Sequence, residues 1–126
     1  MIKILDGAKV LLIDDDLLTL EMYEFVLHNE NAVVKKAKSV ADAKKILESW
    51  EPDLIVSDIG MPGEDGRSFI KTICSDGTRK IPVIAVTGYG SAIDHEELYS
   101  AGCSEVLIKP IDPFLFVSKL EKLRKT

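Results

Sequence analysis

The sequence has 126 residues, of which 46% are hydrophobic and 29% are charged, and this length predicts a single domain spanning 1–126. Its 16 Lys and Arg residues against 21 Asp and Glu give a net charge of −5, which argues against binding to nucleic acid or an anionic membrane. Because no apolar run approaches the roughly 18 residues of a membrane span, we expect a soluble, cytoplasmic protein.

The first apolar run, Val10–Ile13, is too short for a helix and is apolar on successive residues. Such a run is typical of a strand buried on both faces of a parallel sheet. Three acidic residues follow it, and then an apolar stripe with helical spacing, formed by Leu20, Tyr23 and Leu27. A shorter, partly polar run over 32–36 indicates an edge strand.

A second helix is predicted to begin after Ser39, which forms a motif like a capping box with Asp42. Its apolar stripe consists of Ala43, Ile46 and Leu47. The third strand, 54–56, leads to Asp58. A third helix is predicted around Phe69, Ile70 and Ile73.

The fourth strand, 83–86, leads to Thr87, and a fourth helix is predicted over 91–101, where Gly102 ends it. The fifth strand, 106–108, leads to Lys109. The last helix is predicted to begin with a capping acid and a proline and to bury three apolar residues. These five residues are Asp112, Pro113, Phe116, Leu120 and Leu123.

Alternating strands and helices of this length predict an α/β fold, a (βα)5 three-layer sandwich with right-handed parallel crossovers. Functional groups in such folds collect beyond the carboxyl ends of the strands. We therefore expect the residues at four strand ends to converge. They are Asp14 and Asp15, Asp58, Thr87, and Lys109.

Three clustered carboxylates need positive charge, because two of them about 4 Å apart repel by roughly 4 kcal/mol at an effective dielectric constant of 20. Lys109 supplies one positive charge, so two negative charges remain for a divalent cation. Oxygen ligands in a sparse site favour Mg²⁺, with Mn²⁺ also possible. A carboxylate beside Mg²⁺, a hydroxyl and a lysine is suited to phosphoryl transfer through an aspartyl phosphate.

These motifs resemble the receiver domain of two-component response regulators over nearly the whole chain. The matching segments are Val10–Asp16, Pro52–Gly66, Ile81–Thr87 and Ile108–Pro110. The resemblance implies a flavodoxin-like, doubly wound fold with the strand order 2-1-3-4-5. It also implies a regulatory phosphorelay module rather than an enzyme, which accepts a phosphoryl group from a sensor histidine kinase or a histidine phosphotransfer domain.

The resemblance also assigns roles to single residues. Asp58 would be the phosphoacceptor, and Thr87 and Lys109 would bind the phosphoryl oxygens. Asp14, Asp15, Asp58 and the carbonyl of Gly60 would hold the metal, Asp14 through water. A cis bond between Lys109 and Pro110 is implied as well. A downstream partner would bind the face of the fourth helix and fifth strand.

The chain departs from the family at Val106, where an aromatic residue is usual, so a different switching route is expected. Tyr89 and Tyr99 are the nearby side chains large enough to reorient. Gly60 and Tyr89 also occupy the positions that tune aspartyl phosphate hydrolysis in the family. Gly60 cannot orient a water with a side chain.

Two alternatives share parts of this chemistry. A haloacid-dehalogenase-like aspartyl-phosphate phosphatase would need a D-x-D-x-T motif, and the segment Asp14–Leu18 lacks the threonine. A flavodoxin-type binder would need phosphate-binding groups after the first strand, where the acidic residues would repel an anion.

Residues outside these motifs have simpler interpretations. His28 and His95 are expected to lie on helix surfaces, and Cys74 and Cys103 are expected to be reduced thiols. Residues 1–8 could be a linker remnant, because Leu5-Asp6-Gly7 resembles the join after the kinase core of hybrid histidine kinases.

Overall fold

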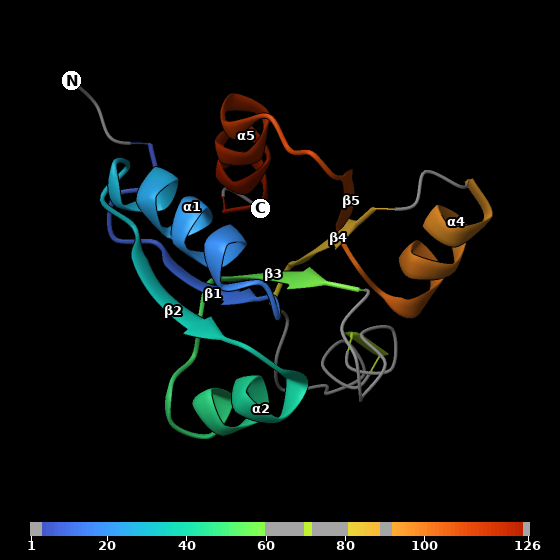
Figure 1. The fold of residues 1–126 in the computed structure, drawn as a ribbon, viewed down its shortest axis with the longest axis horizontal. Coiled ribbons are helices and arrows are strands. Elements are labelled where there is room, and N and C mark those ends of the chain that lie inside the picture. The colour runs from blue at the N-terminus through green and yellow to red at the C-terminus, as the bar shows by residue number, and fades with distance from the viewer. Residues whose placement is uncertain (1–3, 60–69, 72–80, 89–91, 125–126) are drawn as a thin grey trace.

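A computed structural model describes residues 4–59, 70–71, 81–88 and 92–124 (Figure 1). Five parallel strands form one sheet in the order β2-β1-β3-β4-β5, which confirms the expected topology. The strands are β1 (Lys9–Ile13), β2 (Val33–Ala37), β3 (Leu54–Asp58), β4 (Val83–Thr87) and β5 (Glu105–Ile108). The helices are α1 (Leu17–His28), α2 (Val40–Ser49), α4 (Ala92–Ala101) and α5 (Pro113–Arg124).

The predicted third helix lies mostly outside the described residues. Of that segment only Ile70 and Lys71 are described, and both are helical. Ile70 is fully buried among residues of β1, β3 and β4, as an inward-facing helix residue would be. Phe69 and Ile73 are outside the described ranges.

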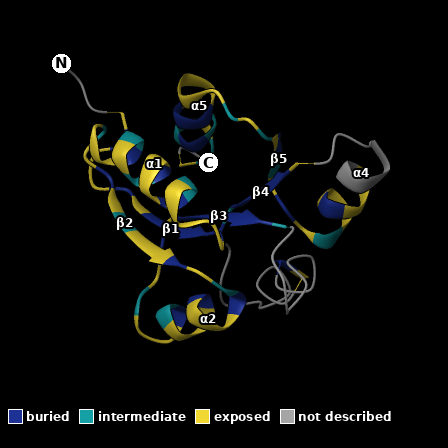
Figure 2. Ribbon diagram, viewed as in Figure 1, coloured by how far each residue is buried: buried dark blue, intermediate teal, exposed yellow. Residues whose placement is uncertain are grey.

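Helices cover both faces of the sheet and give the three layers predicted from the sequence (Figure 1). On one face, α1 and α5 pack against the sheet through Leu20, Leu27 and Leu120. On the other face, α2 and α4 contribute Leu47 and Leu98. Strands β3 and β4 lie at the centre of the molecule and are buried along their whole length (Figure 2).

Two helix starts carry the caps that the sequence predicts. The hydroxyl of Ser39 accepts a hydrogen bond from the backbone N–H of Asp42 at 3.1 Å. The Asp112 carboxylate accepts one from the N–H of Phe114 at 2.8 Å. Each bond satisfies a backbone donor that the first turn of a helix leaves without a partner inside the helix.

The edge position of β2 is confirmed, and most of its residues are exposed. Lys36 pairs with Glu24 of α1 at 2.9 Å, and the Lys35 ammonium lies 5.2 Å from the ring centroid of Trp50. Charged side chains on an edge strand discourage pairing with the edge of another molecule.

The residues before β1 are packed against the domain. Leu5 is fully buried in the apolar cluster that α1 and α5 form with the sheet. Gly7, with a φ of 76°, donates its N–H to the carbonyl of Asn31 at 3.0 Å. Arg124, at the end of α5, donates to the carbonyl of Asp6 at 2.7 Å. Both ends of the domain are therefore joined at the amino edge of the sheet.

Among the described residues, no helix is both long and apolar enough to cross a membrane.

Candidate functional site

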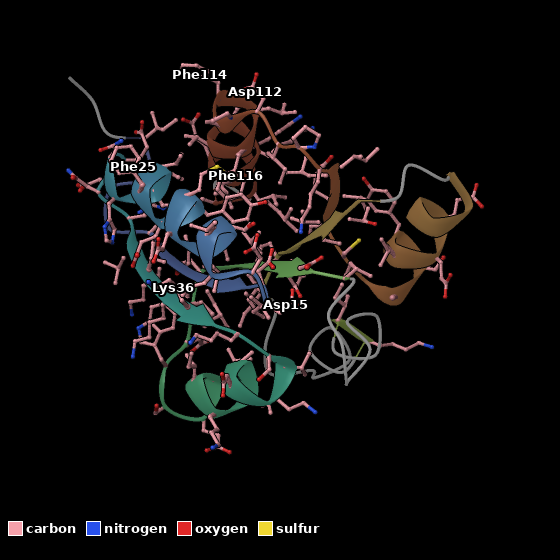
Figure 3. All side chains as sticks on the ribbon, in the orientation of Figure 1. Asp15, Phe25, Lys36, Asp112, Phe114 and Phe116 are labelled. Carbon is pink, nitrogen blue, oxygen red and sulfur yellow. The ribbon has the colours of Figure 1, made fainter. Side chains whose placement is uncertain are left out.

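The carboxyl ends of β1 and β3 bring three aspartates together. One carboxylate oxygen each from Asp14, Asp15 and Asp58 lies within 4.8 Å of the other two. Asp14 and Asp58 are buried, whereas Asp15 is exposed at the end of β1 (Figure 3). The three aspartates therefore converge as predicted, and Asp15 is the member of the cluster that is exposed to solvent.

Lys109 provides the positive charge of the cluster. Its ammonium nitrogen lies 3.4 Å from Asp14 Oδ2 and 3.5 Å from Asp58 Oδ2. Because Lys109 directly follows β5, it joins the last strand to the ends of β1 and β3. The peptide bond between Lys109 and Pro110 is cis, as the resemblance implied.

The surroundings shift the proton equilibria of two charged groups. Burial raises the pKa of Asp14, and the negative charge of Asp58 raises it further, against the opposing effects of the Asp16 N–H and Lys109. Burial alone would lower the pKa of Lys109, but the charges of Asp58 and Asp14 outweigh it and raise that pKa. The site therefore favours a charged lysine, and negative charge is costly at the buried Asp14 carboxylate.

Local hydrogen bonds hold the aspartates in place. Asp14 Oδ1 accepts the backbone N–H of Asp16 at 2.9 Å. The Asp16 carboxylate in turn accepts the hydroxyl of Thr19 at 2.6 Å, at the start of α1. At the end of β3, the buried Ser57 hydroxyl donates to the carbonyl of Asp58 at 3.3 Å. Ser57 was not among the predicted site residues.

Thr87 ends β4 and is buried beside this cluster of strand ends. Its carbonyl accepts the backbone N–H of Lys109 at 2.9 Å, which ties the end of β4 to the residue that carries the ammonium. Gly88 follows, and among the described residues a Cβ placed on it would meet no atom within 4 Å apart from its chain neighbours.

Tyr23 was predicted only as a core residue of α1. It is buried, and its ring packs against Phe116 of α5 with centroids 5.0 Å apart. Burial and the nearby charges of Asp14 and Asp58 raise the pKa of Tyr23 to about 12. Its hydroxyl therefore lies within electrostatic reach of the acidic cluster. Helical periodicity predicts the buried face, but nothing in it indicates this proximity.

Several expected residues lie outside the described part of the chain. These include Gly60, Tyr89 and Cys74, together with the side chain of His95. The other histidine, His28, is exposed with Nε2 4.0 Å from a carboxylate oxygen of Glu24. Cys103 is buried as a thiol.

The chemistry of the donor set fits a hard divalent cation. Asp14, Asp15 and Asp58 offer carboxylate oxygens, and one ammonium offsets only part of their charge. Mg²⁺ prefers such oxygen ligands and retains several waters, which an exposed residue such as Asp15 would permit.

A family model described as the response regulator receiver domain matches residues 10–121. An uncharacterized 14.6 kDa protein from the sodA1 3′ region of Leptolyngbya boryana is 32% identical over 114 residues, with 90% of this chain and 87% of that protein covered. The polar-differentiation response regulator DivK of Brucella ovis is 27% identical over 113 residues, with 89% and 92% covered.

Solved structures give the same fold. The chemotaxis response regulator CheY4 of Vibrio cholerae has a TM-score of 0.86 at 25% identity, with 93% of this chain and 98% of that chain covered. A putative response regulator from Chloroflexus aurantiacus has a TM-score of 0.88 at 27% identity, with 96% and 100% covered. None of these matches supports the phosphatase alternative.

Proposed function

The chain belongs to the response regulator receiver domain family, and on that premise we propose that it accepts a phosphoryl group on Asp58 and thereby switches its binding to partners. Receiver domains are regulatory modules of two-component systems. The observation that carries the proposal is the position of Asp58, buried at a strand end beside Asp14 and within 3.5 Å of the Lys109 ammonium.

The proposed donor is a phosphohistidine on a sensor kinase or a phosphotransfer protein, and the proposed compartment is the cytoplasm. A carboxylate oxygen of Asp58 attacks phosphorus, a new O–P bond forms, and the P–N bond to the donor imidazole breaks with its electron pair moving to nitrogen. Positioning and charge neutralisation dominate catalysis of such transfers.

The side chains around Asp58 have distinct proposed roles. The Lys109 ammonium stays protonated and pairs with a phosphoryl oxygen, and the Thr87 hydroxyl donates a hydrogen bond to another. Asp14, Asp15 and Asp58 would hold Mg²⁺, with the carbonyl of Gly60 as a further proposed ligand. When bound, the ion neutralises negative charge on the carboxylates and the transferred group.

Phosphorylation with a small donor tests this proposal. Wild-type protein incubated with acetyl phosphate and Mg²⁺ should gain one hydroxylamine-sensitive phosphoryl group by mass spectrometry. Asp58→Asn should gain none, because an amide is a poor nucleophile. Asp15→Ala should lose Mg²⁺ binding and phosphorylation together. Equal labelling of Asp58→Asn would reject Asp58 as the acceptor and make Asp15 the next candidate.

A further inference from the structure

Tyr23 is a buried polar residue whose hydroxyl has no partner among the described residues. Its side chain is only 5% exposed, and its ring packs against Phe116 on the face of α1 that meets α5. No hydrogen bond from its hydroxyl reaches any residue of the described part of the chain. Buried hydroxyls nearly always bond to a protein group or to an ordered water. A phenol at this position therefore needs a reason that a core phenylalanine would not.

The hydroxyl is directed toward the acidic end of α1. Tyr23 lies seven residues beyond Asp16, which is about 10 Å along the helix axis. Long side chains on a helix point back toward its N-terminus, and α1 begins directly after the acidic residues that follow β1. Besides burial, the negative charges of Asp14 and Asp58 raise the pKa of the phenol. Two independent features thus place the hydroxyl on the side of the acidic cluster.

Asp14 is a buried carboxylate with unused capacity to accept hydrogen bonds. Its Oδ1 accepts the backbone N–H of Asp16 at 2.9 Å, and its Oδ2 lies 3.4 Å from the Lys109 ammonium. An ionised carboxylate offers about four acceptor positions, so these two donors leave others open. Because Asp14 is only 2% exposed, a further donor has to come from inside the domain.

One bound water would satisfy both groups. No direct hydrogen bond joins the side chains of Tyr23 and Asp14 in this part of the chain. Buried polar groups that are too far apart for a direct bond are commonly bridged by an ordered water. The phenol would donate to the oxygen of this water, and the water would donate one of its protons to a carboxylate oxygen of Asp14.

We infer that Tyr23 is a positioning residue of the metal site, and that its hydroxyl acts on the Asp14 carboxylate through one bound water. Hydrogen bonds to a metal-ligating carboxylate orient it and favour its charged form, and both effects strengthen metal binding. The inference rests on the proposed function, since it assigns a supporting residue to the same Mg²⁺ site.

The test measures Mg²⁺ affinity by isothermal titration calorimetry with magnesium chloride. Tyr23→Phe keeps the ring that packs against Phe116 and removes only the hydroxyl, so the fold should tolerate it. Its Kd for Mg²⁺ should rise about tenfold, as is typical when a residue that supports a metal ligand is lost. The Mg²⁺ concentration that gives half-maximal labelling by acetyl phosphate should rise by the same factor.

Leu27→Val is the matched control. Leu27 is fully buried on the same face of α1, one turn beyond Tyr23, and it carries no polar atom. Its replacement loosens the packing of the helix without touching a hydroxyl, and the Kd for Mg²⁺ should stay within twofold of wild type. Urea denaturation without Mg²⁺ verifies that both variants are folded.

A high-resolution crystal structure of metal-free wild type tests the inference without any variant. It should show a water within about 3.2 Å of both the Tyr23 hydroxyl and an Asp14 carboxylate oxygen. A hydroxyl that bonds to another group, with no water between it and Asp14, would overturn the inference.

The remaining outcomes separate the inference from the proposed function. Unchanged Mg²⁺ affinity in Tyr23→Phe, or an equal loss in Leu27→Val, would overturn the inference while labelling of Asp58 in wild type leaves the proposed function standing. Wild type that binds Mg²⁺ but gains no phosphoryl group would overturn the proposed function alone. Wild type that binds no Mg²⁺ would overturn both.

Discussion

The buried carboxylate of Asp14 lies 3.4 Å from the ammonium of Lys109, although 95 residues separate them in the sequence. The same ammonium also lies 3.5 Å from Asp58. One positive charge thus pairs with two buried carboxylates. Replacing any one of these three side chains therefore changes the electrostatic environment of the other two.

Replacing Lys109 should destabilise the domain. Lys109→Met leaves two buried carboxylates without their cation, and we expect the free energy of unfolding to fall by about 1–2 kcal/mol at pH 7, less than for a fully buried pair because Lys109 is partly exposed. Urea denaturation without Mg²⁺ measures the loss. Lys119→Met, which removes an ion pair with Glu105 at 3.2 Å, is the matched control and should cost less than about 0.5 kcal/mol.

Replacing Asp14 should have the opposite effect. The raised pKa of Asp14 means that ionisation costs more in the folded than in the unfolded protein. Its contribution is therefore most favourable at low pH and is lost as pH rises from 3.8 through the folded pKa. Asp14→Asn should therefore raise the free energy of unfolding at pH 7 without metal. Saturating Mg²⁺ should reduce this advantage, and lower stability of the metal-free variant would contradict the prediction.

Tyr23 should make stability depend on pH in the alkaline range. Its pKa is about 12 in the folded protein, against 10.0 as the reference value. Above pH 10 the unfolded chain loses the phenol proton first, so the contribution present below that pH is lost as pH rises toward 12. Relative to wild type, Tyr23→Phe should gain about 2 kcal/mol between pH 9 and 12. Denaturant unfolding of both proteins, monitored by fluorescence at each pH, measures this gain. If the difference in free energy of unfolding between Tyr23→Phe and wild type stays constant across that range, the pKa shift is ruled out.

Activation should change the α4 face of the sheet. Val106 is buried in the same apolar cluster as Leu98 and Cys103, and a β-branched side chain has little rotamer freedom. With beryllofluoride and Mg²⁺ as a phosphoryl mimic, amide exchange should change mainly across 88–102 and little at Val106. Asp58→Asn should show no change. Changes centred on β5, or confined to 60–80, would point to another route.

Strand positions and the acidic cluster were predictable because each depends on local sequence and one rule of topology. Apolar runs identify strands buried on both faces, and parallel strands place their carboxyl ends at one edge. Asp14, Asp58 and Lys109 are brought together by that rule. The exact ends of the strands were predicted less accurately. Strand β2 begins at Val33 rather than Ala32, and β1 begins at Lys9 rather than Val10.

Contacts between distant segments were not predictable in this way. The stripe of Leu20 and Leu27 indicated the buried face of α1, but Leu18 and Phe25 are equally apolar, and their exposure follows only from what the rest of the chain leaves uncovered. Leu5 precedes every periodic segment, and its burial depends on α1 and α5. The proximity of Tyr23 to the acidic cluster likewise requires the tertiary structure.

The bond between Arg124 and the Asp6 carbonyl bears on how this domain can be engineered. It holds the end of α5 beside the start of β1, at the amino edge of the sheet, while the acidic cluster occupies the carboxyl edge. A fluorescent protein or affinity handle inserted next to Asp6 or Arg124 would therefore lie at the edge of the sheet away from the acidic cluster. Two fluorophores, one inserted at each of these residues, would begin close together, which suits a single-chain energy-transfer sensor.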